Sequence, residues 1–217
     1  MKRVLIIGLL WILLATAACG PAAQPVPSGD LTTMLTDAKT ALDARNPDAA
    51  IAILQQALKT NANSTEAHFL LGNAYAQKGM FSQAESEYLA VLRLNERDVD
   101  ARSNLGVVYY QQQKFAEAEK ALRTALTYKP DDAEIHYNLG GVLAAVNRLN
   151  EAEVEFLKAK ELNPELAELY LGLGSVYKLQ GRKEEAITAL KEFLRRAKDP
   201  TWIGQAEQWL KELGATP

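Results

Sequence analysis

Cysteine and histidine are scarce in this sequence. The 217 residues include one cysteine, Cys19, and two histidines, His68 and His136. A single cysteine cannot form an intramolecular disulfide, so packing alone must hold the fold. Two distant histidines do not supply the clustered ligands that a zinc site needs. We therefore expect no metal and no other cofactor.

The sequence also lacks an excess of positive charge. It has 24 lysines and arginines against 27 acidic residues, which gives a net charge of −3. Domains that bind nucleic acid usually carry a basic face, so nucleic acid is not an expected partner. Glycine and proline, at 13 and 8 residues, are too few for a collagen-like or disordered chain. The 48% of hydrophobic residues is enough to build a core.

No set of residues typical of catalysis stands out. The sequence offers no convincing Ser–His–Asp or Cys–His set. The segment Gly172-Leu173-Gly174 follows no predicted strand and has no third glycine at nucleotide-loop spacing. The adjacent acids Asp131-Asp132 and Glu184-Glu185 lie near predicted helix starts, where the helix dipole favours negative charge. We expect neither an enzyme nor a small-molecule substrate.

The N-terminus has the pattern of an export signal. Lys2 and Arg3 precede an apolar run from Val4 to Ala18, and small residues precede Cys19. A basic head followed by a short apolar core predicts a secretory signal peptide over residues 1–18. The run is shorter than the roughly 17–25 residues that cross a bilayer, which disfavours a transmembrane helix.

The segment Thr16-Ala17-Ala18-Cys19 resembles the lipobox of bacterial lipoproteins, although Thr16 stands where that family usually has leucine. The resemblance implies that Cys19 is acylated and becomes the new N-terminus, so that lipid anchors the protein without a spanning helix. Ordinary cleavage nearby and an uncleaved anchor are the alternatives. The proline-containing stretch after Cys19 predicts an extended tether, giving a segment of residues 19–30.

A repeat of 34 residues follows. A leucine–glycine pair recurs at Leu71-Gly72, Leu105-Gly106, Leu139-Gly140 and Leu173-Gly174. Twelve residues after each glycine comes an alanine, and four residues later a large side chain: Ala84 and Tyr88, Ala118 and Leu122, Ala152 and Phe156, Ala186 and Leu190. The period and these positions resemble the tetratricopeptide repeat family.

This resemblance implies an all-α fold, a right-handed solenoid of antiparallel helix pairs. Small residues would lie where the two helices of a pair cross, and large ones would fill the space between neighbouring pairs. Full repeats are expected over 65–98, 99–132, 133–166 and 167–200. Residues 31–64 form a diverged first repeat, in which Asp37-Ala38 replaces the leucine–glycine pair. Apolar residues at helical spacing predict a capping helix over 201–217.

In this family the first helix of each pair lines the concave surface. The resemblance therefore implies a set of candidate peptide-binding residues there: Phe69, Asn73, Asn104, Tyr110, Tyr137 and Asn138. Amides can pair with both donors and acceptors of a peptide backbone, and aromatic rings give rigid contact area. Asparagine at such positions is also common in idealised repeats. The alternative explanation is therefore that these asparagines reflect the general sequence pattern of the family and have no role in binding.

Four equivalent acids, Glu66, Asp100, Glu134 and Glu168, lie in the first turns of the same helices. Complementarity to the helix dipole explains them, yet they would also favour basic partners. The carboxylate clamp of chaperone adaptors is a poor match. Asn73 and Asn104 fit its asparagines, but Phe69, Glu134 and Asn138 replace its basic residues, which disfavours a C-terminal carboxylate as ligand.

The whole pattern predicts a membrane-tethered scaffold that binds protein or peptide partners, including basic segments. It resembles bacterial tetratricopeptide lipoproteins that help to assemble pili, outer-membrane proteins or cell-wall complexes. A passive spacer and a secreted, non-lipidated adaptor are the alternatives. The expected location is the extracytoplasmic cell envelope. Gly20 follows Cys19 in place of an inner-membrane retention aspartate, so the outer membrane is expected if the source has two membranes.

Overall fold

The computed structural model describes residues 29–216. Within that range the chain forms helices joined by short turns and contains no strand, which confirms the predicted all-α solenoid. The signal peptide, Cys19 and most of the predicted tether lie outside the described residues. The helices are α1 (Leu31–Asp43), α2 (Pro47–Thr60), α3 (Thr65–Gln77), α4 (Phe81–Leu94), α5 (Val99–Gln111), α6 (Phe115–Tyr128), α7 (Ala133–Ala145), α8 (Leu149–Leu162), α9 (Ala167–Leu179), α10 (Lys183–Arg196) and α11 (Pro200–Glu212).

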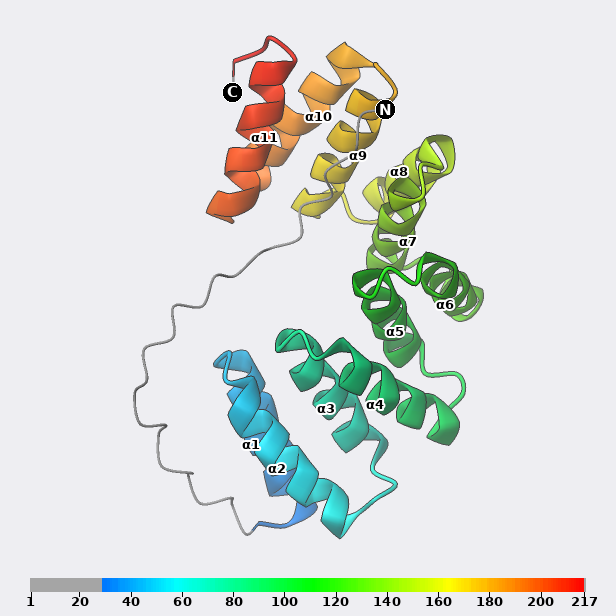
Figure 1. Cartoon of the computed structure of the whole chain (residues 1–217), viewed down its shortest axis with the longest axis vertical. Coiled ribbons are helices and arrows are strands. Elements are labelled where there is room, and N and C mark those ends of the chain that lie inside the picture. Colours follow the sequence, from blue (N-terminus) through cyan, green and yellow to red (C-terminus); the bar gives the residue numbers. More distant parts are fainter. Residues whose placement is uncertain (1–28, 217) are drawn as a thin grey trace.

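The helix pairs stack into an open arc (Figure 1). Figure 1 shows α5 on the inner side of this arc and α6 on the outer side, and α3 lies inside α4 in the same way. The first helices of the pairs thus form the inner face, and we call the face built by α3, α5 and α7 the concave face.

The repeat glycines are required by close helix crossings. A Cβ atom on Gly72 would come within 2.7 Å of Tyr88, and one on Gly140 within 2.8 Å of Phe156. Real Cβ atoms essentially never approach so closely, so any larger residue would force the pair apart. The pairing of a small residue with a large one holds the two helices of each repeat at one separation.

The turns inside the pairs share one backbone conformation. Gly79 and Gly181 have φ values of 72° and 75°, and Gln113 and Asn147 each have 62°. Glycine and asparagine adopt this left-handed region readily, whereas glutamine does so at a cost. Gln113 therefore follows the geometry that helix packing imposes on this position, against its own preference. Arg45, with φ 53°, occupies the same place between α1 and α2.

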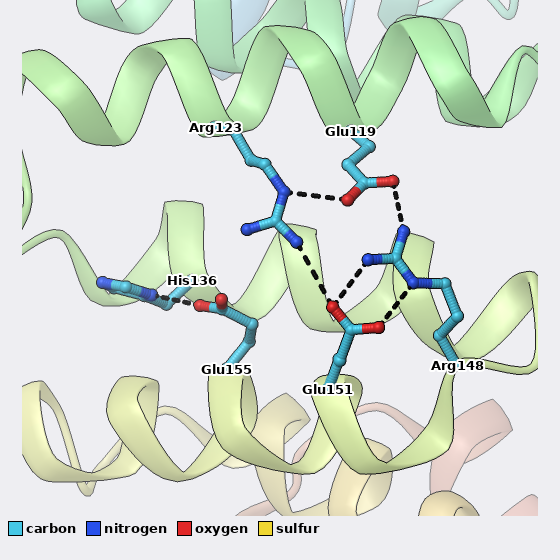
Figure 2. Close-up of polar contacts among 6 residues, drawn as sticks. All are labelled: Glu119, Arg123, His136, Arg148, Glu151 and Glu155. Atoms are coloured by element: carbon cyan, nitrogen blue, oxygen red, sulfur yellow. Dashed lines mark hydrogen bonds and ion pairs between the residues drawn. The ribbon is translucent and has the colours of Figure 1, made fainter.

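Ion pairs join the second helices of successive repeats on the outer side. The residue that precedes each of these helices reaches back to a glutamate in the previous one: Lys114 to Glu85 at 2.9 Å, Arg148 to Glu119 at 2.6 Å and Arg182 to Glu153 at 2.6 Å. Figure 2 shows that Arg148 also contacts Glu151 and that Arg123 bridges the same two glutamates. Because the basic groups are exposed to solvent, which screens the attraction, each pair adds little to the stability of the stack.

The last helix, α11, covers the end of the stack. Leu210 and Ala206 are fully buried and join the core cluster that contains Phe193 of α10. Lys178 of α9 pairs with Glu212 at 2.5 Å and lies over the Trp209 ring at 5.2 Å. Across residues 29–216, no helix is both long and apolar enough to traverse a membrane.

Candidate functional site on the concave face

The six predicted peptide-binding residues all lie on first helices. Phe69 and Asn73 belong to α3, Asn104 and Tyr110 to α5, and Tyr137 and Asn138 to α7, and all six are partly exposed. Their binding role stays a prediction. The structure does show that they differ in how many of their polar atoms are still free to meet a partner.

Asn73 is the centre of an internal hydrogen-bond network. Its Oδ1 accepts a bond of 2.6 Å from the Tyr88 hydroxyl and one of 3.1 Å from Nδ2 of Asn104. Burial raises the pKa of Tyr88, although Asn104 opposes the shift, so the phenol stays protonated and keeps donating. The network links α3, α4 and α5. It leaves Asn73 its amide nitrogen, and Asn104 its Oδ1 and one N–H, for contact with a partner backbone.

The asparagine positions on successive repeats are not equivalent in the structure. Leu122 replaces Tyr88 in the next repeat, so Asn138 meets no tyrosine hydroxyl there. One repeat further, Gly172 takes the asparagine position, and a Cβ on it would lie 2.7 Å from the Phe156 ring. Glycine is required at position 172 because the Phe156 ring fills the space that a side chain would need. No amide therefore follows Asn138 at this position in the last repeat.

The two tyrosines of the predicted set are anchored from behind. Tyr110 packs edge-on against Phe115 with ring centroids 5.7 Å apart, and Tyr137 lies against Phe156 at 5.8 Å. Burial, with contributions from nearby Glu168 and Tyr110, raises the pKa of Tyr137 to about 12. Both phenols therefore stay neutral near pH 7, and both rings are held rigid for contact with a ligand.

A hollow of about 190 Å³ opens between α3, α5 and α7. Its lining combines an aromatic ring, three carboxylates and two further polar groups with one aliphatic residue: Phe69, Asp100, Ser103, Asn104, Asp132, Glu134 and Ile135. Small-molecule sites usually measure roughly 300–1,000 Å³. The hollow is thus of a size for one side chain of a partner.

The acids at equivalent repeat positions have different surroundings in the structure. Glu66 pairs with Lys39 of α1 at 2.5 Å, whereas Asp100 and Glu134 come together at the hollow. Sequence reasoning missed Ser103 and Asp132 as members of this site. Ser103 holds the repeat position that Phe69 and Tyr137 hold in the neighbouring repeats, and a small polar residue at this aromatic position was the available signal.

Asp132 has a structural task as well. Its Oδ1 accepts hydrogen bonds from the backbone amides of Glu134 and Ile135 at 3.0 and 3.1 Å, which caps α7, and Lys129 pairs with it at 2.6 Å. Partial burial opposes ionisation, but Lys129 and the two amides outweigh it and lower the pKa of Asp132. Asp132 is therefore a fixed negative charge at the edge of the hollow.

The histidines hold loops rather than a metal. Nε2 of His68 and of His136 lies 3.1 and 2.8 Å from the carbonyls of Ala62 and Pro130, and Nδ1 of each ring lies 2.6 Å from a glutamate, Glu87 or Glu155. Figure 2 shows the His136–Glu155 contact. Across the described part of the chain, no group of histidine, cysteine and acidic side chains is arranged to hold a metal ion.

Comparison with known families agrees with this architecture. Models described as tetratricopeptide repeat match residues 41–105, 133–166 and 167–200, and a TPR repeat model matches residues 108–147. The chain belongs to the tetratricopeptide repeat family. Repeats of this family serve as scaffolds for protein–protein interaction, and none of the matches indicates a catalytic family. No curated protein sequence matches the chain.

Several solved tetratricopeptide repeat structures share the fold. PilF from Pseudomonas aeruginosa superposes with a TM-score of 0.73 at 20% identity, covering 85% of this chain and 84% of its own. TTC0263 from Thermus thermophilus gives 0.72 at 21% identity, covering 83% and 99%. YrrB, described as a TPR protein with an unusual peptide-binding site, gives 0.62 at 23% identity, covering 82% and 92%.

Proposed function

We propose that this tetratricopeptide repeat protein binds extended segments of partner proteins on its concave face. The observation that carries the proposal is the hollow between α3, α5 and α7, where aromatic and polar side chains from three successive repeats converge. Packing of the helix pairs does not require such a hollow, because the large residues of the pairs are already buried behind it. Tyr110 and Tyr137 extend the same face with rigid apolar area.

We further propose that lipid on Cys19 tethers this scaffold to an extracytoplasmic membrane of the cell envelope. The basic head, apolar run and small residues before Cys19 support the proposal. In a source with two membranes, Gly20 favours the outer one. A tethered array with a free groove suits the assembly of an envelope complex, because it holds partners near the membrane where they act.

The binding role is tested by capturing partners from detergent-solubilised membranes of the source. The wild-type protein is compared with a Tyr110→Ala, Asn138→Ala double variant. Losing Tyr110 is expected to weaken partner binding by about 1–3 kcal/mol, since buried aromatic anchors dominate such interfaces. Val154→Ala on α8 is the matched control, because Val154 is 64% exposed and lies outside the concave face. Equal capture by all three proteins would favour the passive spacer.

The tether is tested separately. Cys19→Ala is expected to move the protein from the membrane fraction to the soluble fraction, since one residue carries the anchor. Intact-mass measurement of the wild-type protein should show the added acyl groups. A wild-type mass without acyl groups would favour the secreted, non-lipidated adaptor and leave the groove proposal untouched.

A further inference from the structure

The hollow on the concave face offers mainly hydrogen-bond acceptors. One N–H of the Asn104 amide is bonded to Asn73, so the amide keeps its Oδ1 and one N–H for a ligand. Asp100 and Glu134 contribute carboxylates from the first turns of α5 and α7. An ionised carboxylate accepts hydrogen bonds and cannot donate them. A ligand that fits this lining must therefore bring donors.

Ser103 adds an independent indication that the hollow can bind a donor group. Its residue is 9% exposed and lines the hollow, and its hydroxyl forms no hydrogen bond with any residue of the described chain. Serine hydroxyls in helices usually bond the carbonyl one turn earlier, as Ser86 does here to Ser82 at 3.1 Å. The Ser103 oxygen is not one of the fully enclosed unpaired atoms of the described chain, which are Arg102 Nε, Gln112 Oε1 and Arg196 Nε, so it is open to the hollow. A donor placed in the hollow could bond this oxygen without displacing a protein partner.

The charges around the hollow leave an excess of negative charge. The lining contains the carboxylates of Asp100, Asp132 and Glu134 and no basic residue, and Lys129 beside it pairs with Asp132. Hydrogen bonding to Asp132 raises the pKa of Lys129, and Asp100 and Glu134 add to that shift, so all three acids act on one point in space. Lys129 neutralises one of them only.

Phe69 completes the lining on the α3 side. Its ring is tilted against Tyr88 with centroids 6.0 Å apart, which fixes its orientation from behind. An aromatic face beside carboxylates suits a cation on an apolar stem, since the ring attracts the charge and packs against the methylene groups.

We infer that the hollow receives a lysine or arginine side chain from the partner segment that lies on the concave face. The inference rests on the proposed function and names the residue that the groove selects. Asp100 and Glu134 bind the cation, the Ser103 hydroxyl and Asn104 Oδ1 accept its remaining N–H groups, and Phe69 packs on its stem. A partner's C-terminal carboxylate is disfavoured, because it would meet mainly acids and acceptors.

The test begins with random peptides displayed on phage and selected against the full chain. Selected peptides are expected to share one lysine or arginine. In a synthetic peptide from this set, replacing that residue with citrulline, which is neutral and of similar shape, should weaken binding about tenfold or more, since charged hydrogen bonds are lost. Exchanging arginine and lysine in the same peptide shows which cation the hollow prefers.

Variants of the protein locate the effect. Asp100→Asn and Glu134→Gln should each weaken binding of the basic peptide about tenfold, and Ser103→Ala should weaken it severalfold. Glu184→Gln is the matched control, because Glu184 is an exposed carboxylate on α10, a second helix that does not line the hollow. Lys129→Gln should tighten binding by removing a competing cation. Tighter binding by Asp100→Asn or weaker binding by Lys129→Gln would overturn the inference, since both would indicate an anionic ligand.

Two outcomes separate this inference from the proposed function. Peptides that lose affinity with Tyr110→Ala but share no basic residue would overturn the inference and leave the groove proposal standing. Selection that yields only peptides insensitive to Tyr110→Ala, Asp100→Asn and Glu134→Gln would overturn both.

Discussion

At the scale of single residues, the adjacent glycines Gly140 and Gly141 in α7 have different surroundings. A Cβ on Gly140 would lie 2.8 Å from the Phe156 ring, whereas one on Gly141 would meet no atom within 4 Å. Glycine inside a helix costs about 1 kcal/mol relative to alanine. At Gly140 the protein accepts this cost because the Phe156 ring leaves no room for a side chain. At Gly141 no neighbouring atom requires glycine. Glycine there keeps side-chain bulk away from Tyr137 and Asn138, which lie one turn earlier on the same helix.

The same substitution at these two positions should have opposite effects. Gly140→Ala should lower the free energy of unfolding by about 1–3 kcal/mol through overpacking against Phe156. Gly141→Ala should raise it by about 0.5–1 kcal/mol, because alanine loses less backbone entropy on folding. Urea unfolding of the two variants measures both values. Equal destabilisation would show that α7 is rotated relative to the described packing.

At the scale of helices, the last repeat differs from the earlier ones at the start of its first helix. Ser64, Asp98 and Asp132 each cap a first helix through a side-chain oxygen, but α9 begins after Leu166 without such a bond. The C-terminal pair therefore depends more on packing against α11. That packing comes chiefly from Leu210, which is fully buried, and from the Lys178–Glu212 pair.

Weakening α11 should loosen the last repeat first. Leu210→Ala should lower the free energy of unfolding by about 2–5 kcal/mol, as a buried leucine leaves a cavity. Trp202→Ala in the same helix is the control, since Trp202 is 43% exposed and its loss should cost far less. Hydrogen exchange should show lost protection in α9 and α10 before α3 and α4. Uniform loss along the chain would contradict a stack stabilised by neighbouring repeats.

Removal of residues 199–217 is the stronger version of this experiment. It exposes the apolar side of α10 around Phe193, and we expect aggregation or fraying from the C-terminus. Light scattering and hydrogen exchange measure the two results. Full protection of α9 and α10 in the shortened chain would show that the last repeat needs no cap.

At the scale of the whole molecule, ion pairs make the stability of the C-terminal repeats depend on pH. Arg195 and Arg196 lower the pKa of Glu192 to about 2, and Lys178 and Gln208 lower that of Glu212. Both glutamates stabilise the folded C-terminal repeats only while they are ionised. Their ordinary unfolded-state value is about 4.5. A carboxyl whose folded pKa is lowered contributes its stabilisation above the unfolded value and loses it as the pH falls through the folded value.

Stability should accordingly fall as the pH drops from about 4.5 toward 2, and the C-terminal repeats should be affected. Glu192→Gln should flatten this part of the stability–pH curve. Glu184→Gln, which removes an exposed carboxylate from the same helix, is the matched control and should leave the slope close to that of the wild type. Thermal unfolding followed by circular dichroism across this pH window gives the comparison. Parallel curves for all three proteins would show that the arginine contacts of Glu192 do not persist in solution.

The fold could be predicted from the sequence because its main contacts are local. A repeat glycine and the large residue that fills the space above it, such as Gly140 and Phe156, belong to one helix pair. Their spacing along the chain therefore fixes their meeting in space. Gln113 departs from the repeat pattern, because the other full repeats have glycine or asparagine at the left-handed turn. The structure keeps the turn there because the packing of the two helices outweighs the preference of one residue.

The candidate site could be predicted only in part. The sequence by itself determined that Phe69, Asn73, Asn104, Tyr110, Tyr137 and Asn138 lie on the first helices, since repeat position decides which side of a helix a residue occupies. It did not determine that Tyr88 occupies the oxygen of Asn73, or that Ser103 and Asp132 join Asp100 and Glu134 around one hollow. These contacts cross between repeats. They depend on the rotation and offset of each pair relative to the next, which bulky residues such as Phe156 set through packing and which no spacing within one repeat encodes.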